Sequence, residues 1–257
     1  MKNLSASAIR WMGGFAALVL SSMLIGCGNQ GVRTVIVPLV DSTASTGSAH
    51  DRYAAGLERI LQACRGGEHI VGDTITADSL ATQSCRLDVS IPAYDPLQDT
   101  ALTFGMKKRA ALSQARQEMK KLLAERRPER GTDLLNAFSL AAKVFQADEN
   151  RGAHEKALVV FSDMLEQTRT CDFASLQLDD AQIRRIIARE RAAGRLPDLR
   201  GVEVWVAGAA ASSRDGLSSD RIYRIQTFWL RYFKSCGANL PPAHYGTTLL
   251  DFHLSGQ

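Results

Sequence analysis

Three short, almost uninterrupted apolar stretches constrain the fold of this chain more than any other feature. They cover residues 35–40, 157–161 and 202–208, and the first runs directly into Asp41. Apolar residues at successive positions, rather than at alternate ones, are typical of strands that are covered on both faces in a parallel sheet. Pro38 interrupts the first stretch. Because proline has no N–H to donate, we expect a local break in strand pairing there.

Amphipathic segments with helical spacing separate these strands. Helices are predicted over residues 49–63, 107–127, 134–145, 179–193 and 219–235. Further strands are predicted over residues 68–75 and 86–92, which could form a hairpin, and over residues 247–254. Helices that alternate with apolar strands indicate an α/β fold, here a Rossmann-like, doubly wound, mostly parallel sheet with helices on both faces. We expect one domain over residues 33–257.

Composition is ordinary for a globular domain, with 45% hydrophobic and 23% charged residues in a chain of 257. The formal charge is +4, but Lys2 and Arg10 lie in residues 1–26, which we expect to be removed. The remainder has 31 − 2 = 29 bases against 27 acids, a charge of +2. A balance so close to neutral does not indicate a nucleic-acid partner.

Residues 1–26 have the pattern of an export signal. Lys2 and Arg10 carry its positive charge, and residues 13–26 are uncharged and mostly apolar, a run too short to span a bilayer. The run ends in Leu24-Ile25-Gly26-Cys27, which resembles the lipobox of bacterial lipoproteins. The resemblance implies that Cys27 carries lipid and begins the mature chain, with residues 27–32 as a short tether. A plain signal peptide followed by a chance cysteine is the alternative.

Lipidation would place the protein in the bacterial cell envelope, because several acyl chains together hold a protein stably at a membrane. Gly28 follows Cys27 where the enterobacterial sorting rule would need Asp for the inner membrane, so resemblance to that rule favours the outer membrane. The five residues 28–32 reach at most ~18 Å when extended. Since the first strand runs from the tether toward Asp41, we expect that end of the sheet to point away from the bilayer.

Export also affects the interpretation of Cys64, Cys85, Cys171 and Cys236. In an oxidising compartment two disulfides are the default expectation, and four cysteines allow three pairings. We favour sequence neighbours, Cys64 with Cys85 and Cys171 with Cys236. Zinc is a poorer alternative, because the chain has no C-x-x-C pair among these four and its histidines are scattered.

Oxygen-bearing side chains gather next to the predicted strand ends. Asp41, Thr43 and Ser45 follow the first apolar strand, Thr132 precedes a helix, and Asp163 follows the second apolar strand. Ligand sites of open α/β sheets lie at this edge. Carboxylates and hydroxyls are hard ligands that suit Mg²⁺, or Mn²⁺, with some water retained. Such an ion could accept a carboxylate from outside at an open coordination position.

In this order and context the five residues resemble the metal-ion-dependent adhesion site of the von Willebrand factor A (VWA) family, which is D-x-S-x-S, then Thr, then Asp. The resemblance spans roughly residues 33–254 and implies a VWA-like domain that binds a protein ligand offering an acidic residue. The chain departs from the pattern at Thr43, where serine is commoner, and at Met164, where the family often has glycine. The alternative is that these residues only cap loops and helices.

These features favour a metal-dependent binding lipoprotein that is not an enzyme. The alternative is a metal-independent structural lipoprotein of an envelope assembly, such as a secretion or conjugation apparatus. An Asp at a strand end also serves as nucleophile in haloacid-dehalogenase-like phosphatases, but Asp41-Ser42-Thr43 lacks the second Asp of their D-x-D signature. The P-loop, G-x-S-x-G and H-E-x-x-H patterns are also absent from the sequence.

Two segments are rich in bases. Residues 107–130 have nine bases and three acids, and residues 184–200 have six bases and two acids. Such segments are usually solvated helix faces, and contact with anionic lipid headgroups or with an acidic partner is the alternative. Trp205, Trp229 and Tyr232 are expected in the core rather than in a recognition surface.

Overall fold

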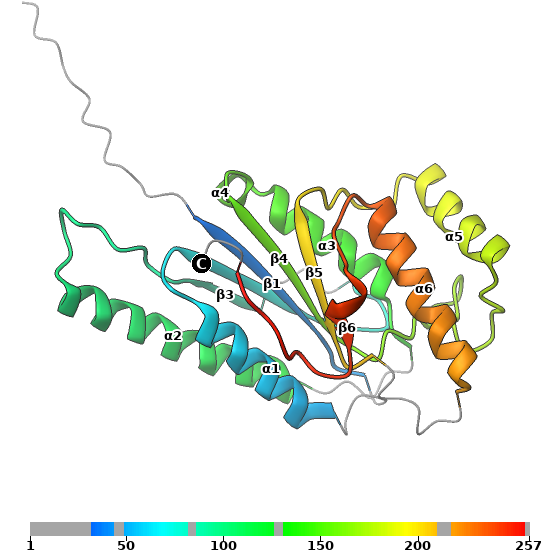
Figure 1. The fold of residues 1–257 in the computed structure, drawn as a ribbon, viewed down its shortest axis with the longest axis horizontal. Helices are drawn as coiled ribbons and strands as arrows, with labels where there is room; N and C mark the ends of the chain where they lie inside the picture. Colours follow the sequence, from blue (N-terminus) through cyan, green and yellow to red (C-terminus); the bar gives the residue numbers. More distant parts are fainter. Residues whose placement is uncertain (1–31, 44–48, 82–85, 126–130, 210–216, 255–257) are drawn as a thin grey trace, which may run out of the picture.

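The computed structural model describes residues 32–43, 49–81, 86–125, 131–209 and 217–254. The export signal, Cys27, Ser45 and Cys85 lie outside the described residues. One six-stranded sheet runs through the molecule in the order β3-β2-β1-β4-β5-β6, with helices packed on both sides (Figure 1).

The strands are β1 (Thr34–Asp41), β2 (Glu68–Ile75), β3 (Leu87–Ser90), β4 (Glu155–Phe161), β5 (Val202–Ala207) and β6 (Tyr245–Gly246). The helices are α1 (His50–Ala63), α2 (Ala101–Ala124), α3 (Leu134–Gln146), α4 (Asp148–Arg151), α5 (Asp180–Ala192), α6 (Ser219–Ser235) and the 3-10 helix η3 (Pro242–His244). All neighbouring strands pair in parallel except β3, which is antiparallel to β2. The predicted doubly wound, mostly parallel α/β class is therefore confirmed, and so is the hairpin of β2 with β3.

The helices divide between the two faces of the sheet, each with its own hydrophobic core. Residues of α1 and α2 pack on one face, and residues of α3, α5 and α6 pack on the other (Figure 1). β1 is buried along its whole length, which explains its unbroken apolar sequence. Trp205, Trp229 and Tyr232 are buried, as expected for core residues.

Pro38 interrupts pairing on one side of β1 only. The register with β2 lapses at Val37 and Pro38, whereas both residues remain in register with β4. Gly72 of β2 lies so close that a Cβ there would be 2.7 Å from the Pro38 carbonyl oxygen. The expected break is therefore local, and the missing side chain of Gly72 provides space for the proline ring.

Helix α2 begins six residues earlier than the residue 107 predicted from the apolar spacing. Thr100 forms a capping box with Thr103, in which each side chain accepts from the other residue's backbone N–H. In the first turns of α2 the apolar residues Leu102 and Met106 are exposed, so these turns do not bury an apolar face. The spacing of apolar residues therefore gives no sign of where the helix starts. The cap, rather than the apolar pattern, determines where this helix begins.

The predicted strand over residues 247–254 is wrong. Only Tyr245–Gly246 pairs with β5, and the chain then crosses the face of the sheet without regular structure (Figure 1). Leu249 and Leu254 are buried in the same core as α1, and the ring of Phe252 lies 5.0 Å from that of Trp205. The apolar residues of this segment therefore cover the sheet face instead of extending the sheet.

The expected disulfide between Cys171 and Cys236 is wrong, because no disulfide joins the described cysteines. Cys171 and Cys236 are free and buried in the core on the α3 side, and Cys64 is free and buried on the α1 side. Burial raises the pKa of each thiol to about 12, so each is protonated at neutral pH. These cysteines serve as small apolar core residues. Cys85, the expected partner of Cys64, lies outside the described residues.

Candidate metal centre

The carboxyl ends of the neighbouring strands β1 and β4 bring the first and last of the candidate residues to one edge of the sheet. Asp41 is the last residue of β1, and Asp163 stands two residues beyond the end of β4. Val40 and Phe161 are in register, so the two strands end side by side. Parallel pairing therefore accounts for the meeting of residues that are 122 positions apart in the sequence.

Asp41 lies at the centre of a buried hydrogen-bond network. Its Oδ1 accepts from the Thr43 backbone N–H at 3.0 Å and from the Thr43 hydroxyl at 2.6 Å, and its Oδ2 accepts from the Ser162 hydroxyl at 2.8 Å. The side chain is 3% exposed. Burial raises the pKa of this carboxyl, and the three hydrogen bonds act in the opposite direction. A nearby cation would favour the charged form.

Thr132 reaches the same place from the start of α3. Its hydroxyl lies 3.4 Å from the Thr43 hydroxyl, to which it donates. The Thr132 backbone exchanges two hydrogen bonds with Gln167, which ties it to the loop that carries Asp163. Gly131 makes this close approach possible, since it has a φ of 115° and a Cβ there would lie 2.8 Å from the Gln167 carbonyl oxygen.

Asp163 and Met164 form a tight turn after β4. The Asp163 Oδ1 accepts from the Leu165 backbone N–H at 3.0 Å, and the side chain is 5% exposed. Met164 has a φ of 65°, a left-handed conformation that a glycine adopts without strain. The Met164 side chain is fully buried and its carbonyl oxygen accepts from the Trp229 indole N–H at 2.9 Å, so packing holds the strained backbone in place.

The structure adds two residues that sequence reasoning did not select. Ser162 links Asp41 to the Met164 backbone N–H, which donates to its hydroxyl at 3.0 Å. The Tyr53 hydroxyl of α1 lies near both carboxylates, and its pKa is raised by burial and then by Asp41 and Asp163. That hydroxyl has no hydrogen-bond partner within the described part of the chain. Ser162 could have been noticed from its place next to Asp163, but no sequence signal indicates Tyr53.

The donors at this edge fit a hard divalent cation. The Asp41 carboxylate and the hydroxyls of Thr43 and Thr132 meet, and the buried Asp163 carboxylate lies near the same Tyr53 hydroxyl as Asp41. The fifth predicted ligand, Ser45, lies outside the described residues. Oxygen donors of this kind are those that Mg²⁺ and Mn²⁺ prefer. Among the described residues no group of three or more His, Cys, Asp or Glu side chains forms a metal cluster. A site here therefore depends on hydroxyls as well as carboxylates.

A polar cavity of about 830 Å³ lies beside this centre, and Asp133 and Glu166 help to line it. The Glu166 Oε2 accepts from the backbone N–H groups of Leu134 and Leu135, at 2.8 and 3.2 Å, so it caps the start of α3. Burial and then the Asp133 carboxylate raise the pKa of Glu166 to about 8. The Glu166 side chain therefore retains its proton in most molecules at neutral pH.

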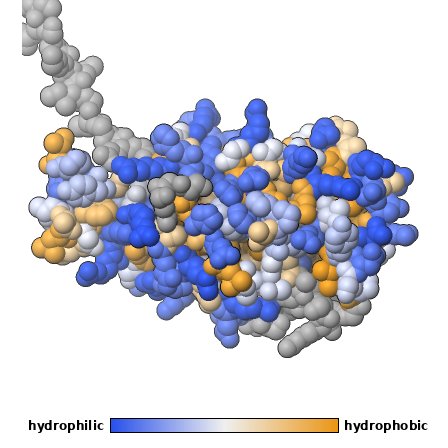
Figure 2. Space-filling view, in the orientation of Figure 1, coloured by the Kyte–Doolittle hydropathy of each residue, from blue (hydrophilic) through white to orange (hydrophobic). Residues whose placement is uncertain are grey.

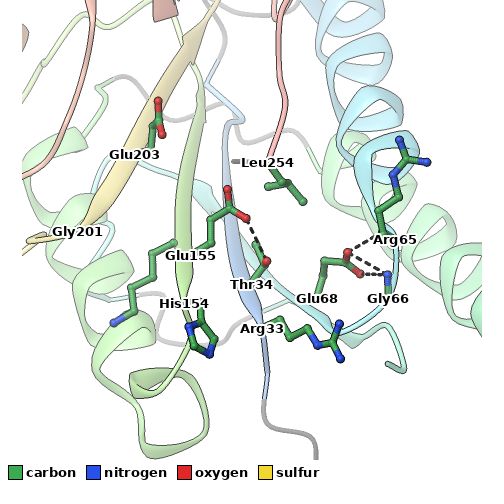
Figure 3. A pocket seen from close by; sticks show the side chains of 11 residues that line it. Arg33, Thr34, Arg65, Gly66, Glu68, His154, Glu155, Gly201, Glu203 and Leu254 are labelled. Atoms are coloured by element: carbon green, nitrogen blue, oxygen red, sulfur yellow. Dashed lines mark hydrogen bonds between the residues drawn. The ribbon is translucent and has the colours of Figure 1, made fainter. Parts of the chain in front are cut away.

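A second cavity, of about 660 Å³, lies at the opposite, amino edge of the sheet (Figure 3). Three bases and three acids line this cavity, so its formal charges balance. They are Arg33, Arg65 and Lys156, and Glu68, Glu155 and Glu203. The Glu68 carboxylate accepts from the backbone N–H groups of Arg65 and Gly66, at 2.6 and 2.8 Å. The acids thus act as local structural partners, and the cavity shows no excess charge that would select an ionic ligand.

No protein-family model matches the chain, and no curated protein matches it significantly. Among the matching solved structures is the crystal structure of an aerotolerance-related membrane protein from Bacteroides fragilis with multiple mutations to serines. The chains are 13% identical, the match covers 68% of this chain and 66% of the other, just under two thirds, and the TM-score is 0.32. A likeness this distant says nothing about function. Among the described helices, none has the length and apolar character needed to cross a membrane.

Proposed function

We propose that this chain is a lipid-anchored protein of the bacterial cell envelope that binds a protein ligand through a divalent cation, Mg²⁺ or Mn²⁺, and catalyses no reaction. One observation carries the proposal. The Thr132 and Thr43 hydroxyls meet at 3.4 Å beside the Asp41 carboxylate, although Thr132 is 89 positions from Thr43 in the sequence. Capping alone does not require a threonine from the start of α3 to approach the end of β1.

Five residues would hold the cation: Asp41, Thr43, Ser45, Thr132 and Asp163. When bound, the ion would supply an open coordination position for an acidic side chain of the partner. Because most of these donors are neutral hydroxyls, the centre would keep positive charge with which to attract that carboxylate. Ser162 orients Asp41 through its 2.8 Å hydrogen bond, in the way that outer hydrogen bonds commonly orient metal ligands.

The anchor would be Cys27, joined to the fold by residues 28–32. β1 begins at Thr34, just beyond this tether, and ends at Asp41. The eight residues of this strand therefore separate the tethered edge from the metal edge by about 23 Å at the usual rise per residue. This geometry would present the metal edge to partners away from the bilayer. The sorting pattern at Gly28 favours the outer membrane over the inner one.

The alternative is a metal-independent structural lipoprotein of an envelope assembly, such as a secretion or conjugation apparatus. One observation favours it. Both oxygens of Asp41 already accept hydrogen bonds from Thr43 and Ser162, and Asp163 accepts one from Leu165. The edge is therefore internally hydrogen-bonded without a cation, as a purely structural loop cluster would be.

Titration calorimetry of the purified full chain separates the two functions. After chelator treatment, the protein is titrated with Mn²⁺ and with Mg²⁺, beside Asp163→Ala and the matched control Asp198→Ala, whose exposed carboxylate pairs with Arg200. The proposal predicts one saturable site that Asp163→Ala loses and Asp198→Ala keeps. Absence of saturable binding by the folded protein would reject the metal-dependent function in favour of the structural one.

A further inference from the structure

Exposed apolar side chains gather at one end of the molecule. Leu97, Leu102 and Met106 are 93%, 73% and 61% exposed, and Tyr94 is 43% exposed. These four, here called the apolar tip, make up more than half of the seven large apolar residues that are exposed in the described part of the chain. Isolated exposed apolar residues need no explanation, but a group of them marks a contact surface.

The apolar tip is formed by the first turns of α2 and the loop before them. Leu102 and Met106 are four residues apart and therefore lie on the same side of the helix. The Tyr94 ring packs edge-on against the Phe104 ring, with centroids 5.5 Å apart, which holds the loop against the helix. Figure 2 shows apolar side chains at this end of the molecule, where α2 begins in Figure 1.

Backbone contacts place this end beside the start of β1. Gly67 accepts from the Arg33 backbone N–H at 2.8 Å and donates to Ile91 at 2.9 Å. The adjacent Gly66 lies against the Phe104 ring, where a Cβ would be 2.9 Å from a ring carbon. Arg33 directly follows the predicted tether of residues 28–32, so the apolar tip lies at the tethered end of the sheet.

Basic residues lie next to the apolar tip, in α2 and in the segments that contact its first turns. They are Arg33, Arg65, Lys107, Lys108 and Arg109, whereas the acids in the same segments are Glu68, Asp95 and Asp99. Lys107 pairs with Asp99 at 2.8 Å, and the five bases against three acids leave a local charge of +2. An apolar group within an excess of positive charge is the pattern of a surface that meets anionic headgroups.

We propose that the apolar tip inserts into the headgroup region of an anionic phospholipid bilayer, with the neighbouring bases on the phosphates. The inference rests on the proposed lipid anchorage and is independent of the metal site. A tether of five residues, at most ~18 Å long, keeps this edge of the sheet within reach of the membrane that holds the lipid. Contact by the apolar tip would then orient the domain, where the tether alone would leave it free to rotate.

Tryptophan quenching by brominated lipid tests this proposal. The full chain is reconstituted into vesicles of phosphatidylethanolamine and phosphatidylglycerol, with acyl chains brominated near the headgroup. Leu97→Trp is compared with Tyr223→Trp, a 66% exposed residue near the start of α6, at the opposite edge of the sheet. The signal of the parent protein, with its own tryptophans, is subtracted from both. Because both positions are exposed, neither substitution should disturb folding.

We expect a roughly twofold loss of emission for Leu97→Trp and little loss for Tyr223→Trp, as for an interfacial residue against a distant one. Adding Lys108→Glu and Arg109→Glu should weaken the quenching of Leu97→Trp. Vesicles that carry the protein without quenching Leu97→Trp would overturn the inference and leave the anchorage standing. Protein that does not float with the vesicles at all would overturn both.

Discussion

The two ends of the sheet differ in how they treat polar and apolar groups. At the carboxyl edge, two aspartates and several hydroxyls are buried, and burial raises the pKa of Asp41. At the amino edge, the charged residues that line the cavity balance one another, and the apolar tip next to them is exposed to solvent. Proteins usually bury apolar groups and expose polar ones. One end of this sheet buries carboxylates and the other exposes apolar side chains, which is why we propose a function for each end.

The difference follows from strand direction. The loops that follow parallel strands all lie at the same edge of the sheet. The polar residues at the ends of β1 and β4 are therefore close to one another. The amino edge receives the loops that return from helices, and the first turns of α2 extend beyond the sheet there (Figure 1). Burial of carboxylates costs stability, whereas exposure of Leu97 costs little, so substitutions at the two edges should have unequal effects.

The largest expected effect is that of Asp41→Ala. The substitution leaves the Thr43 backbone N–H and the Thr43 and Ser162 hydroxyls without their acceptor, at a cost of about 3 kcal/mol in the free energy of unfolding. Glu68→Ala at the amino edge removes the acceptor of two backbone N–H groups that are only partly buried, so it should cost less. Urea unfolding measures both, and only Asp41→Ala should abolish Mn²⁺ binding. Equal Mn²⁺ affinity in the two variants would contradict the comparison.

Glu166 should make stability depend on pH. The unfolded chain releases this proton near the ordinary value of 4.5, whereas burial and Asp133 raise the pKa in the folded protein to about 8. The folded state binds more protons between these values, so stability should fall as pH rises through that window, by up to about 1.4 kcal/mol for each pH unit.

Glu166→Gln tests that dependence, because its amide oxygen can still accept from Leu134 and Leu135. Urea unfolding at pH 5, 6, 7 and 8 should give a flatter profile for the variant than for the parent. Parallel profiles would show that Glu166 does not titrate in this range.

At position 164, a glycine variant should be more stable than an alanine variant, which is the reverse of the usual order. Both Met164→Ala and Met164→Gly lose the buried side chain, but only glycine adopts a φ of 65° without strain. We expect Met164→Gly to be the more stable variant by about 1 kcal/mol, against the ordinary preference for alanine. Chemical denaturation of the pair measures this difference, and greater stability of the alanine variant would exclude strain at this turn.

The smallest effect is expected for Tyr53→Phe, which removes a buried hydroxyl that lacks a partner within the described residues. Without a cation, the variant should be more stable by about 1 kcal/mol, since an unsatisfied polar group is costly to bury. If the hydroxyl donates to a group of the occupied metal centre, the same change should also weaken Mn²⁺ binding. Thermal unfolding with and without Mn²⁺ measures both effects, and a less stable variant in chelator would contradict this reasoning.

Much of the architecture could be predicted from the sequence because its signals are local. Apolar stretches over residues 35–40, 157–161 and 202–208 indicate strands that need cover on both faces, and that requirement leads to a parallel sheet. A parallel sheet in turn predicts that Asp41, Thr43 and Asp163 lie close together, since the loops after parallel strands lie at the same edge. The fold class, and the edge where a metal centre would lie, could therefore be predicted from the amino-acid sequence alone.

Other features depended on contacts between segments far apart in the chain. The apolar residues of 247–254 resemble those of a strand, but they cover the sheet face next to α1. Cys171 and Cys236 allowed a disulfide by counting, but packing keeps them as free thiols. Tyr53 approaches Asp41 only because α1 packs on the sheet at the end of β4, where the Tyr53 ring contacts that of Phe161. These points depend on tertiary packing, because composition and residue spacing do not show which faces of the sheet still need cover after it has formed.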